Sequence, residues 1–156
     1  MPSPTISYLI CTTALVILIF VMPFFYSMTV EFIQVDMITR ELREIADYVS
    51  NTIANLYYLV NSTDVHEVSL QKELVYLPSD IENFLYILKI SGKNGYASNV
   101  TAYLKTRPSV AAVAWLAPGL KIDGARSFVE SCGLPVVAGC FRNRDGVFVW
   151  IGYGSA

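Results

Sequence analysis

The first thirty residues of the chain contain no charged side chain, and residues 6–26 are almost entirely apolar. About twenty consecutive apolar residues in a helix span the hydrocarbon core of a bilayer, so this run is long enough to cross one. No linker follows it, because residues 30–60 contain neither Gly nor Pro and continue a helical pattern. The sequence therefore predicts a long helix over residues 1–60 and leaves residues 61–156 for a globular head.

A cleaved secretory signal is the alternative interpretation of the apolar run. Such a signal requires a basic N-terminal region, a shorter apolar core and a small-residue cleavage site. No Lys or Arg precedes the run, and no small-x-small site separates it from the helical pattern that follows. We therefore expect a retained membrane helix. Met1 is either the initiator or the residue left after removal of a leader, and the sequence does not decide between them.

Beyond the apolar run the helix becomes amphipathic. Apolar residues advance in steps of three and four, while Asp36, Arg40 and Glu44 follow the opposite face at i,i+4 spacing. Ser3 and Pro4 suit the N-cap and first helical positions, and Pro23 should kink or loosen the helix. A continuous helix from residue 4 to residue 60 would be about 85 Å long at 1.5 Å per residue. The apolar stripe consists of Val35, Ile38, Leu42, Ile45, Val49, Ile53, Leu56 and Val60.

The residues after 60 have the texture of a β-rich domain. Short apolar runs alternate with turn signals, of which residues 143–146, containing Asp145-Gly146 between two apolar runs, give the strongest hairpin signal. The predicted fold class is α+β: a long hydrophobic N-terminal helix, then an antiparallel sandwich or a sheet wrapped on the helix. Residues 125–132 could instead form a short helix. The predicted strands are 65–77, 84–90, 100–104, 110–116, 128–132, 136–141 and 147–153.

Residues that could carry catalysis are sparse. The chain has none of the common nucleophile, phosphate-loop, dinucleotide or zinc motifs, and His66 is its one histidine. Asp80 and Glu82 flank Ile81 in a predicted turn, where solvated carboxylates are the simpler interpretation. A formal net charge of -2 without a basic cluster argues against a nucleic-acid partner. We expect no enzyme activity, cofactor, metal or small-molecule substrate.

Two sequons and two cysteines suggest covalent features of an exterior head. Asn61 and Asn99 both begin an N-x-[ST] triplet, and each is a candidate N-glycosylation site at a predicted turn. Cys132 and Cys140 flank a Gly-Leu-Pro turn that could bring them together as a cross-strand disulfide. Two reduced core cysteines are the equally weighted alternative. Cys11 lies inside the apolar helix as a small hydrophobic residue.

This plan resembles the type IV pilin superfamily, and the archaeal pilins in particular. The resemblance is architectural and covers the whole chain: an apolar N-terminal helix, an uninterrupted amphipathic continuation and a small β head. Bacterial-type pilins carry a glutamate at the fifth mature position, whereas this chain has Thr5. Membership implies a helical homo-oligomer at the cell surface, inserted in the membrane before assembly, with bundled helices inside and often glycosylated heads outside.

The first functional hypothesis is therefore a structural filament subunit, and the expectation is that Leu42→Asp or Ile45→Asp abolishes assembly but not membrane insertion. The second is a single-span membrane protein, such as a minor pilin or an archaellum-stator-like accessory protein, whose head binds an extracellular partner. A membrane-tethered enzyme or sensor lacks a recognisable site. The residues expected to pack in the filament core are Ile6, Leu9, Leu15, Leu18, Phe24, Val35, Ile38, Leu42, Ile45, Val49, Ile53 and Leu56.

Overall fold

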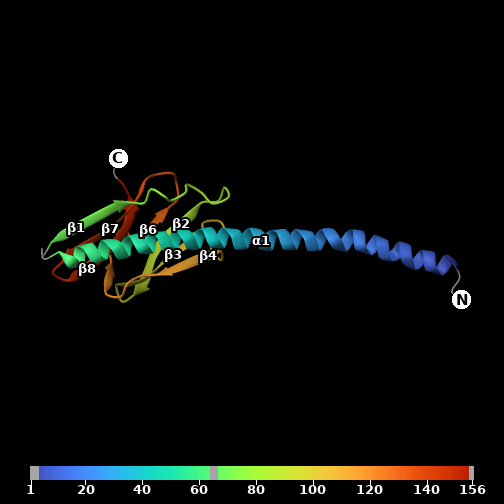
Figure 1. Ribbon diagram of the computed structural model, residues 1–156, viewed down its shortest axis with the longest axis horizontal. Coiled ribbons are helices and arrows are strands. Elements are labelled where there is room, and N and C mark those ends of the chain that lie inside the picture. Colours follow the sequence, from blue (N-terminus) through green and yellow to red (C-terminus); the bar gives the residue numbers. More distant parts are fainter. Residues whose placement is uncertain (1–3, 64–66, 155–156) are drawn as a thin grey trace. The chain divides into compact units, whose positions relative to one another are not determined.

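A computed structural model of the protein describes residues 4–63 and 67–154. The predicted fold class is confirmed: one long apolar helix, α1 (Pro4–Ser62), precedes a mostly antiparallel eight-stranded sheet (Figure 1). The predicted N-cap Ser3 lies outside the described residues, as does His66. The strands are β1 (Val68–Glu73), β2 (Tyr86–Lys93), β3 (Tyr96–Leu104), β4 (Ala111–Trp115), β5 (Leu120–Ile122), β6 (Phe128–Glu130), β7 (Val136–Asn143) and β8 (Gly146–Tyr153).

The strands pair in the order β1-β7-β8-β5-β3-β2-β6, and β4 pairs with β3 outside this path. Every pairing is antiparallel except that of β5 with β8. The chain from β5 to β6 also follows β8 for several residues, since Ile151 N–H donates to the Arg126 carbonyl at 2.9 Å. It then leaves β8 and pairs with β2. The short β5 was missed in the sequence, and the segment considered as a helix over 125–132 contains strand β6 instead.

Two tight hairpins follow the turn signals of the sequence. The β7–β8 turn is the predicted one, with Asn143 opposite Gly146. In the β2–β3 turn, Asn94 and Gly95 both have positive φ, 54° and 81°, which is the pattern of a type I′ turn. A β-bulge between Ser91 and Gly92 precedes that turn. Gly92 is required there, because an added Cβ would lie 1.7 Å from the Tyr96 carbonyl oxygen.

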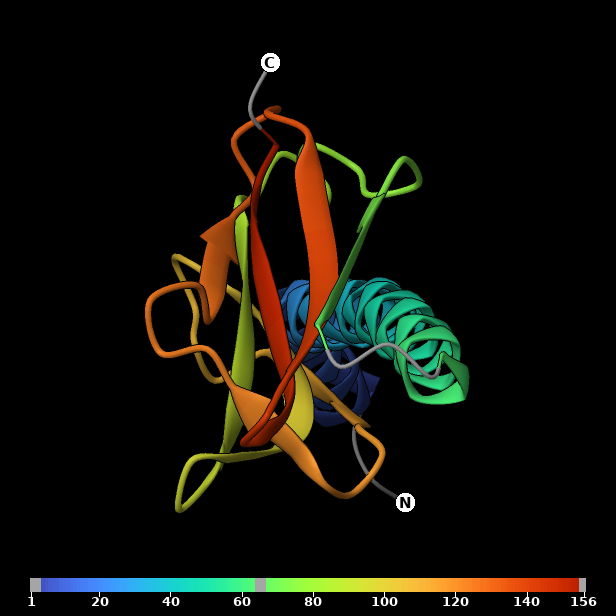
Figure 2. The same ribbon diagram turned by 90° about the vertical axis from the view of Figure 1, so that its left-hand side faces the viewer.

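The chain divides into two compact units, Met1–Met37 and Ile38–Ala156. The second unit contains the C-terminal part of α1, which lies against one face of the sheet (Figure 2). The predicted division at residue 60 therefore differs from the structure, since the head includes more than twenty helical residues assigned to a separate stalk. Alternate residues of the strands complete the core, and alanines at Ala102, Ala114 and Ala138 leave room for the helix.

The amphipathic stripe of α1 is covered by the head of the same chain. Leu42, Val49 and Ile53 are fully buried within the second unit, and the Ser50 hydroxyl donates to the Trp115 carbonyl at 2.6 Å. The assignment of this part of the stripe to filament packing is therefore wrong, because the head of the same chain already covers it. The residues corrected in this way are Ile38, Leu42, Ile45, Val49, Ile53 and Leu56. Val35 precedes them and is half-buried.

Candidate functional site: the exposed apolar helix and a groove on the head

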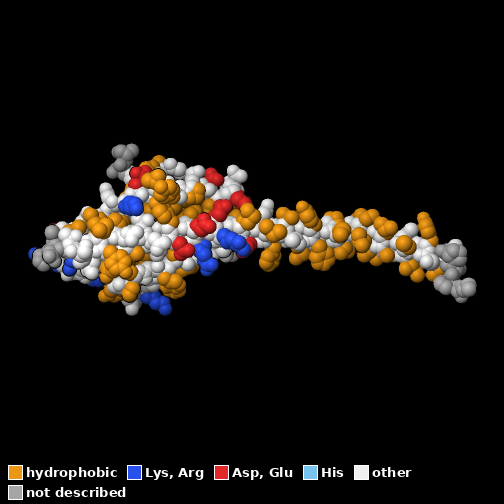
Figure 3. Space-filling model, in the orientation of Figure 1, with side chains coloured by type: hydrophobic (Ala, Val, Ile, Leu, Met, Phe, Trp, Pro, Cys, Tyr) orange, Lys and Arg blue, Asp and Glu red, His pale blue; other side chains and the backbone are white. Residues whose placement is uncertain are grey.

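The largest exposed apolar surface belongs to residues 5–30 of α1, here called the apolar segment. An 18-residue stretch of this helix has a mean hydropathy of 2.4, and none of it is buried. Apolar side chains follow the segment in Figure 3 without an intervening charge. Soluble monomers rarely expose contiguous apolar patches beyond a few hundred Å². The five predicted packing residues here, all more than half exposed, are Ile6, Leu9, Leu15, Leu18 and Phe24.

Four hydroxyl groups of the apolar segment, those of Thr12, Thr13, Ser27 and Thr29, donate to its own backbone. Thr12 donates to the Tyr8 carbonyl at 2.9 Å, Thr13 to Leu9 at 2.8 Å and Thr29 to Phe25 at 2.8 Å. These bonds matter because a polar group without a partner in hydrocarbon costs several kcal/mol. Pro23 removes one backbone donor, yet α1 continues through it without interruption. The segment is therefore suited to an apolar surrounding, by length, composition and internal hydrogen bonding.

Apolar exposure continues beyond the uncharged segment. Between Glu31 and the first buried helix residue, Ile38, the side chains of Phe32, Ile33 and Met37 are 81, 55 and 49% exposed. Two carboxylates, Glu31 and Asp36, lie among these apolar side chains. The interior of a bilayer does not accommodate charged carboxylates. In water, the three apolar side chains would remain exposed to solvent.

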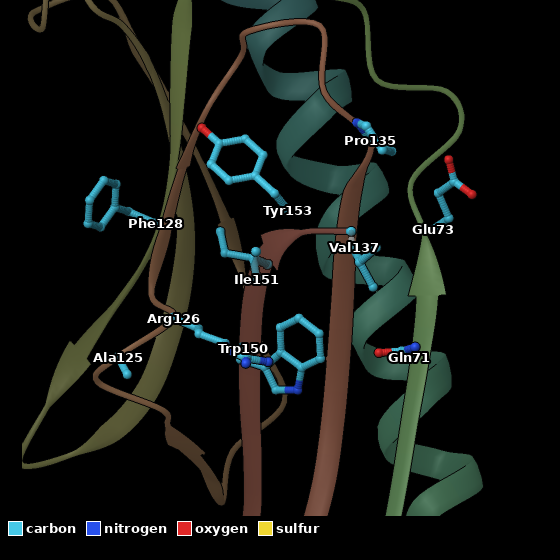
Figure 4. Close-up of a pocket in the computed structure, with 12 residues that line it drawn as sticks. Gln71, Glu73, Ala125, Arg126, Phe128, Pro135, Val137, Trp150, Ile151 and Tyr153 are labelled. Carbon is cyan, nitrogen blue, oxygen red and sulfur yellow. The ribbon is translucent and has the colours of Figure 1, made fainter. Parts of the chain in front are cut away.

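A groove on the head forms the second candidate site (Figure 4). It has a volume of about 700 Å³ and lies where the β5–β6 chain diverges from β8. The groove opens on the face of the sheet opposite α1, since Cys140 and Ala138 of β7 point their side chains toward the core and α1, while Val137 and Gly139 lie on the other face. Its lining consists of Gln71, Glu73, Ala125, Arg126, Phe128, Pro135, Val137, Trp150, Ile151, Gly152, Tyr153 and Gly154.

A stacked pair gives the groove its floor. Gly139 lies opposite Trp150 in the β7–β8 ladder, and a Cβ on it would fall 2.3 Å from indole Cε2. The missing side chain therefore allows the indole to lie across β7. The guanidinium of Arg126 sits over this ring, with Cζ 5.0 Å from the centroid. Such a cation–π contact favours this orientation of the exposed Arg126 side chain by about 0.5–1 kcal/mol.

Tyr153 bridges the gap between β8 and β6. Its hydroxyl donates to the Glu130 carbonyl at 2.9 Å and accepts from Glu130 N–H at 3.1 Å, so a side chain replaces a strand pairing. Burial is the main cause that raises the pKa of this phenol, and a hydrogen bond with the Cys132 side chain adds to it. Tyr153 therefore remains a neutral group on the groove wall. The groove was not predicted from the sequence. Trp150, which stands between apolar residues of the last predicted strand, was a signal that could have indicated it.

The two sequons differ in the structure. Asn61 is exposed in the last turn of α1, as expected of a glycan acceptor. Asn99 does not lie at a turn: it sits within β3, opposite Ser91 on one side and Trp115 on the other. Its side-chain Oδ1 is buried and has no hydrogen-bond partner among the described residues. The structure thus presents Asn61 to solvent and partly encloses Asn99.

Both head cysteines are free thiols, so the proposed cross-strand disulfide is absent from the structure. Cys140 is buried in β7, where its thiol donates to the Ile53 carbonyl of α1 at 3.8 Å. Cys132 is exposed and lies close to the Tyr153 hydroxyl, and Tyr153 lies opposite Val136. Cys140 follows Val136 by four strand residues, about 13 Å. A disulfide requires Cα atoms within about 7 Å of each other.

Other polar clusters give no sign of chemistry. Asp80, one of the two predicted turn carboxylates, accepts a hydrogen bond from the adjacent Ser79 hydroxyl at 3.2 Å. Within residues 4–63 and 67–154, no three His, Cys, Asp or Glu side chains are grouped so as to hold a metal ion. Searches against protein-family models, curated proteins and solved structures returned no match to the chain.

Proposed function

We propose that the protein is a pilin-like structural subunit of an extracellular type IV pilus-like filament. Its N-terminal helices would bundle in the filament core, and its β head would form the outer surface. The observation that carries the proposal is an apolar helix surface that is exposed on all sides and extends past the uncharged segment. The resemblance to archaeal pilins, drawn from the order of helix and head, agrees with it.

Helix length supports this proposal. The uncharged residues 5–30 extend about 39 Å at 1.5 Å per residue, against a hydrocarbon thickness of about 30 Å. Phe32, Ile33 and Met37 follow beyond that length and are exposed. Lipid covers the first part before assembly, and neighbouring helices of the same kind replace it in the polymer. Neighbouring copies also cover the three additional side chains, each of which is worth about 2 kcal/mol when buried.

The geometry of such a polymer follows from its contacts. One helix surface meets a different surface of the next copy, and contacts of this head-to-tail kind that do not close into a ring produce an open filament. The correction to the amphipathic stripe limits which residues take part: the packing set is the exposed Ile6, Leu9, Leu15, Leu18 and Phe24, together with the stretch after Glu31. The head remains folded by its own contacts with α1.

The test is electron microscopy of material sheared from native cells, with mass spectrometry of the fibres. Thin fibres composed mainly of this chain are the expected result. A variant with Phe32→Ser, Ile33→Ser and Met37→Ser should insert in the membrane and fold its head but form no fibres, because these side chains lie outside both lipid and head. Leu59→Ser, an exposed apolar position in the head part of α1, is the matched control and should assemble. Normal fibres from the triple variant would refute the proposed contact.

A single-span membrane-anchored accessory protein is the alternative function. Two observations favour it: residues 5–30 are sufficient for an anchor by themselves, and the head carries a groove. This alternative predicts that the chain stays in detergent-solubilised membranes and that sheared fibres lack it. It also predicts that the triple variant behaves as the unmodified chain does.

A further inference from the structure

The groove on the head has polar walls whose side chains are not engaged elsewhere. Gln71 and Glu73 come from alternate positions of β1, and neither side chain makes a hydrogen bond to any residue in the described part of the chain. Arg126 faces them across the floor, and its guanidinium stacks on Trp150 without a carboxylate partner among the described residues. One side thus offers acceptors and an amide, and the other offers N–H donors.

The floor and one end of the groove are apolar and aromatic. Phe128 and Tyr153 are both exposed large side chains, and Trp150 lies beneath Arg126. Figure 4 shows Tyr153 beside β6, Phe128 on β6 with its ring directed away from Tyr153, and Gln71 and Glu73 on the opposite side, on β1. The Tyr153 ring is held by its two hydrogen bonds to the Glu130 backbone, so this wall is already formed without a ligand.

These features exclude most classes of ligand. Glu73 would repel an anionic ligand in the groove, and Arg126 would repel a cationic one. At the outward backbone edge of β6, a peptide adding as a strand would be hindered, because the Tyr153 hydroxyl already occupies N–H and C=O of Glu130 there. A purely apolar ligand would leave three polar side chains desolvated, at about 1–3 kcal/mol for each unsatisfied group.

We propose that the groove between β1, β8 and β6 binds a short neutral oligosaccharide. Each sugar hydroxyl is both a donor and an acceptor, so it can pair with Glu73, Gln71 and Arg126 alike. The C–H face of a pyranose ring complements the negative face of an aromatic ring, here Phe128 or Tyr153. The volume of about 700 Å³ lies within the range of roughly 300–1,000 Å³ typical of small-ligand sites. The inference does not depend on filament assembly.

The experiment uses the full chain in a zwitterionic detergent, because sugar-headed detergents would compete for the groove. The chain has two tryptophans, and Trp115→Phe leaves Trp150 as the only indole reporter in the groove floor. Its emission is followed while cellotetraose, maltotetraose, mannotetraose or chitotetraose is added. Tetragalacturonic acid provides an acidic sugar of the same length. A saturable change with at least one neutral tetrasaccharide, and none with the acidic one, is the expected result.

Variants separate a specific site from a general effect. Arg126→Ala and Phe128→Ala, both at exposed positions, should each weaken binding roughly tenfold or more, the effect of losing one charge-assisted hydrogen bond or one stacking face. Lys93→Ala and Tyr58→Ala change an exposed cation and an exposed aromatic residue outside the groove, and should bind as the parent does. The proposal is overturned by no response to any neutral sugar, by preference for the acidic sugar, or by equal binding in all four variants.

Discussion

Replacing Ile53 by alanine tests whether the head or the filament covers the amphipathic stripe. Ile53 is fully buried against the head, and its carbonyl accepts the Cys140 thiol. The substitution removes three carbon atoms, which corresponds to a transfer free energy of about 2.4 kcal/mol at about 0.8 kcal/mol per methylene. The cavity left behind adds to this loss. We expect the free energy of unfolding to fall by about 3–4 kcal/mol, a large part of the total stability of about 5–15 kcal/mol of an ordinary domain.

Leu15 provides the matched control on the same helix. Its side chain is 55% exposed and lies in the unit Met1–Met37, so Leu15→Ala should leave the unfolding of the head unchanged within about 0.5 kcal/mol. Urea unfolding of detergent-solubilised chain, followed by tryptophan fluorescence, measures both variants, because both tryptophans belong to the head. A loss below about 1 kcal/mol for Ile53→Ala would refute the burial argument. An equal loss for Leu15→Ala would refute the division into two units.

Burial of the amphipathic stripe in the head also changes what Asp substitutions in the stripe would test. Leu42→Asp and Ile45→Asp were expected to abolish assembly while leaving membrane insertion intact. Because both side chains are buried in the head, a carboxylate there would unfold it. Failure of these variants to form filaments would therefore report on folding and not on packing between copies. Variants at Phe32, Ile33 and Met37 avoid this ambiguity.

Two further predictions concern the head. Gly139→Ala should destabilise it by about 1–3 kcal/mol and alter the fluorescence of Trp150, since the added Cβ collides with the indole; equilibrium unfolding with emission spectra checks this, and parental stability would contradict it. Burial raises the pKa of Cys140 from 9.0 to about 12 and, with a smaller contribution from Asp80, that of Tyr86 from 10.0 to about 12. The unfolded chain therefore loses these protons first, and stability should be constant below about pH 9 and fall above it by up to about 1.4 kcal/mol per pH unit for each group. Cys140→Ala should delay that fall to about pH 10, and an unchanged alkaline profile would contradict the assignment.

The sequence by itself determined the helix, its apolar and amphipathic parts, and the turns. An uncharged run of this length leaves few alternatives, and the periodicity of residues 35–60 identifies one buried face without naming what buries it. The hairpin at Asn143–Gly146 could also be predicted from the sequence, because a short loop with positive-φ residues is determined by its own few residues. Local signals of this kind depend on neighbouring residues alone.

Only the tertiary structure decided which surface covers the stripe, where the cysteines lie and where the groove forms. Each of these depends on segments far apart in the chain: Cys140 meets Ile53, and Trp150 meets both Gly139 and Arg126. The missed strand β5 shows the same limit, because its three residues pair with β8, a strand more than twenty residues further along the chain. Apolar periodicity says that a face is buried, but the partner that buries it is set by the packing of the whole head.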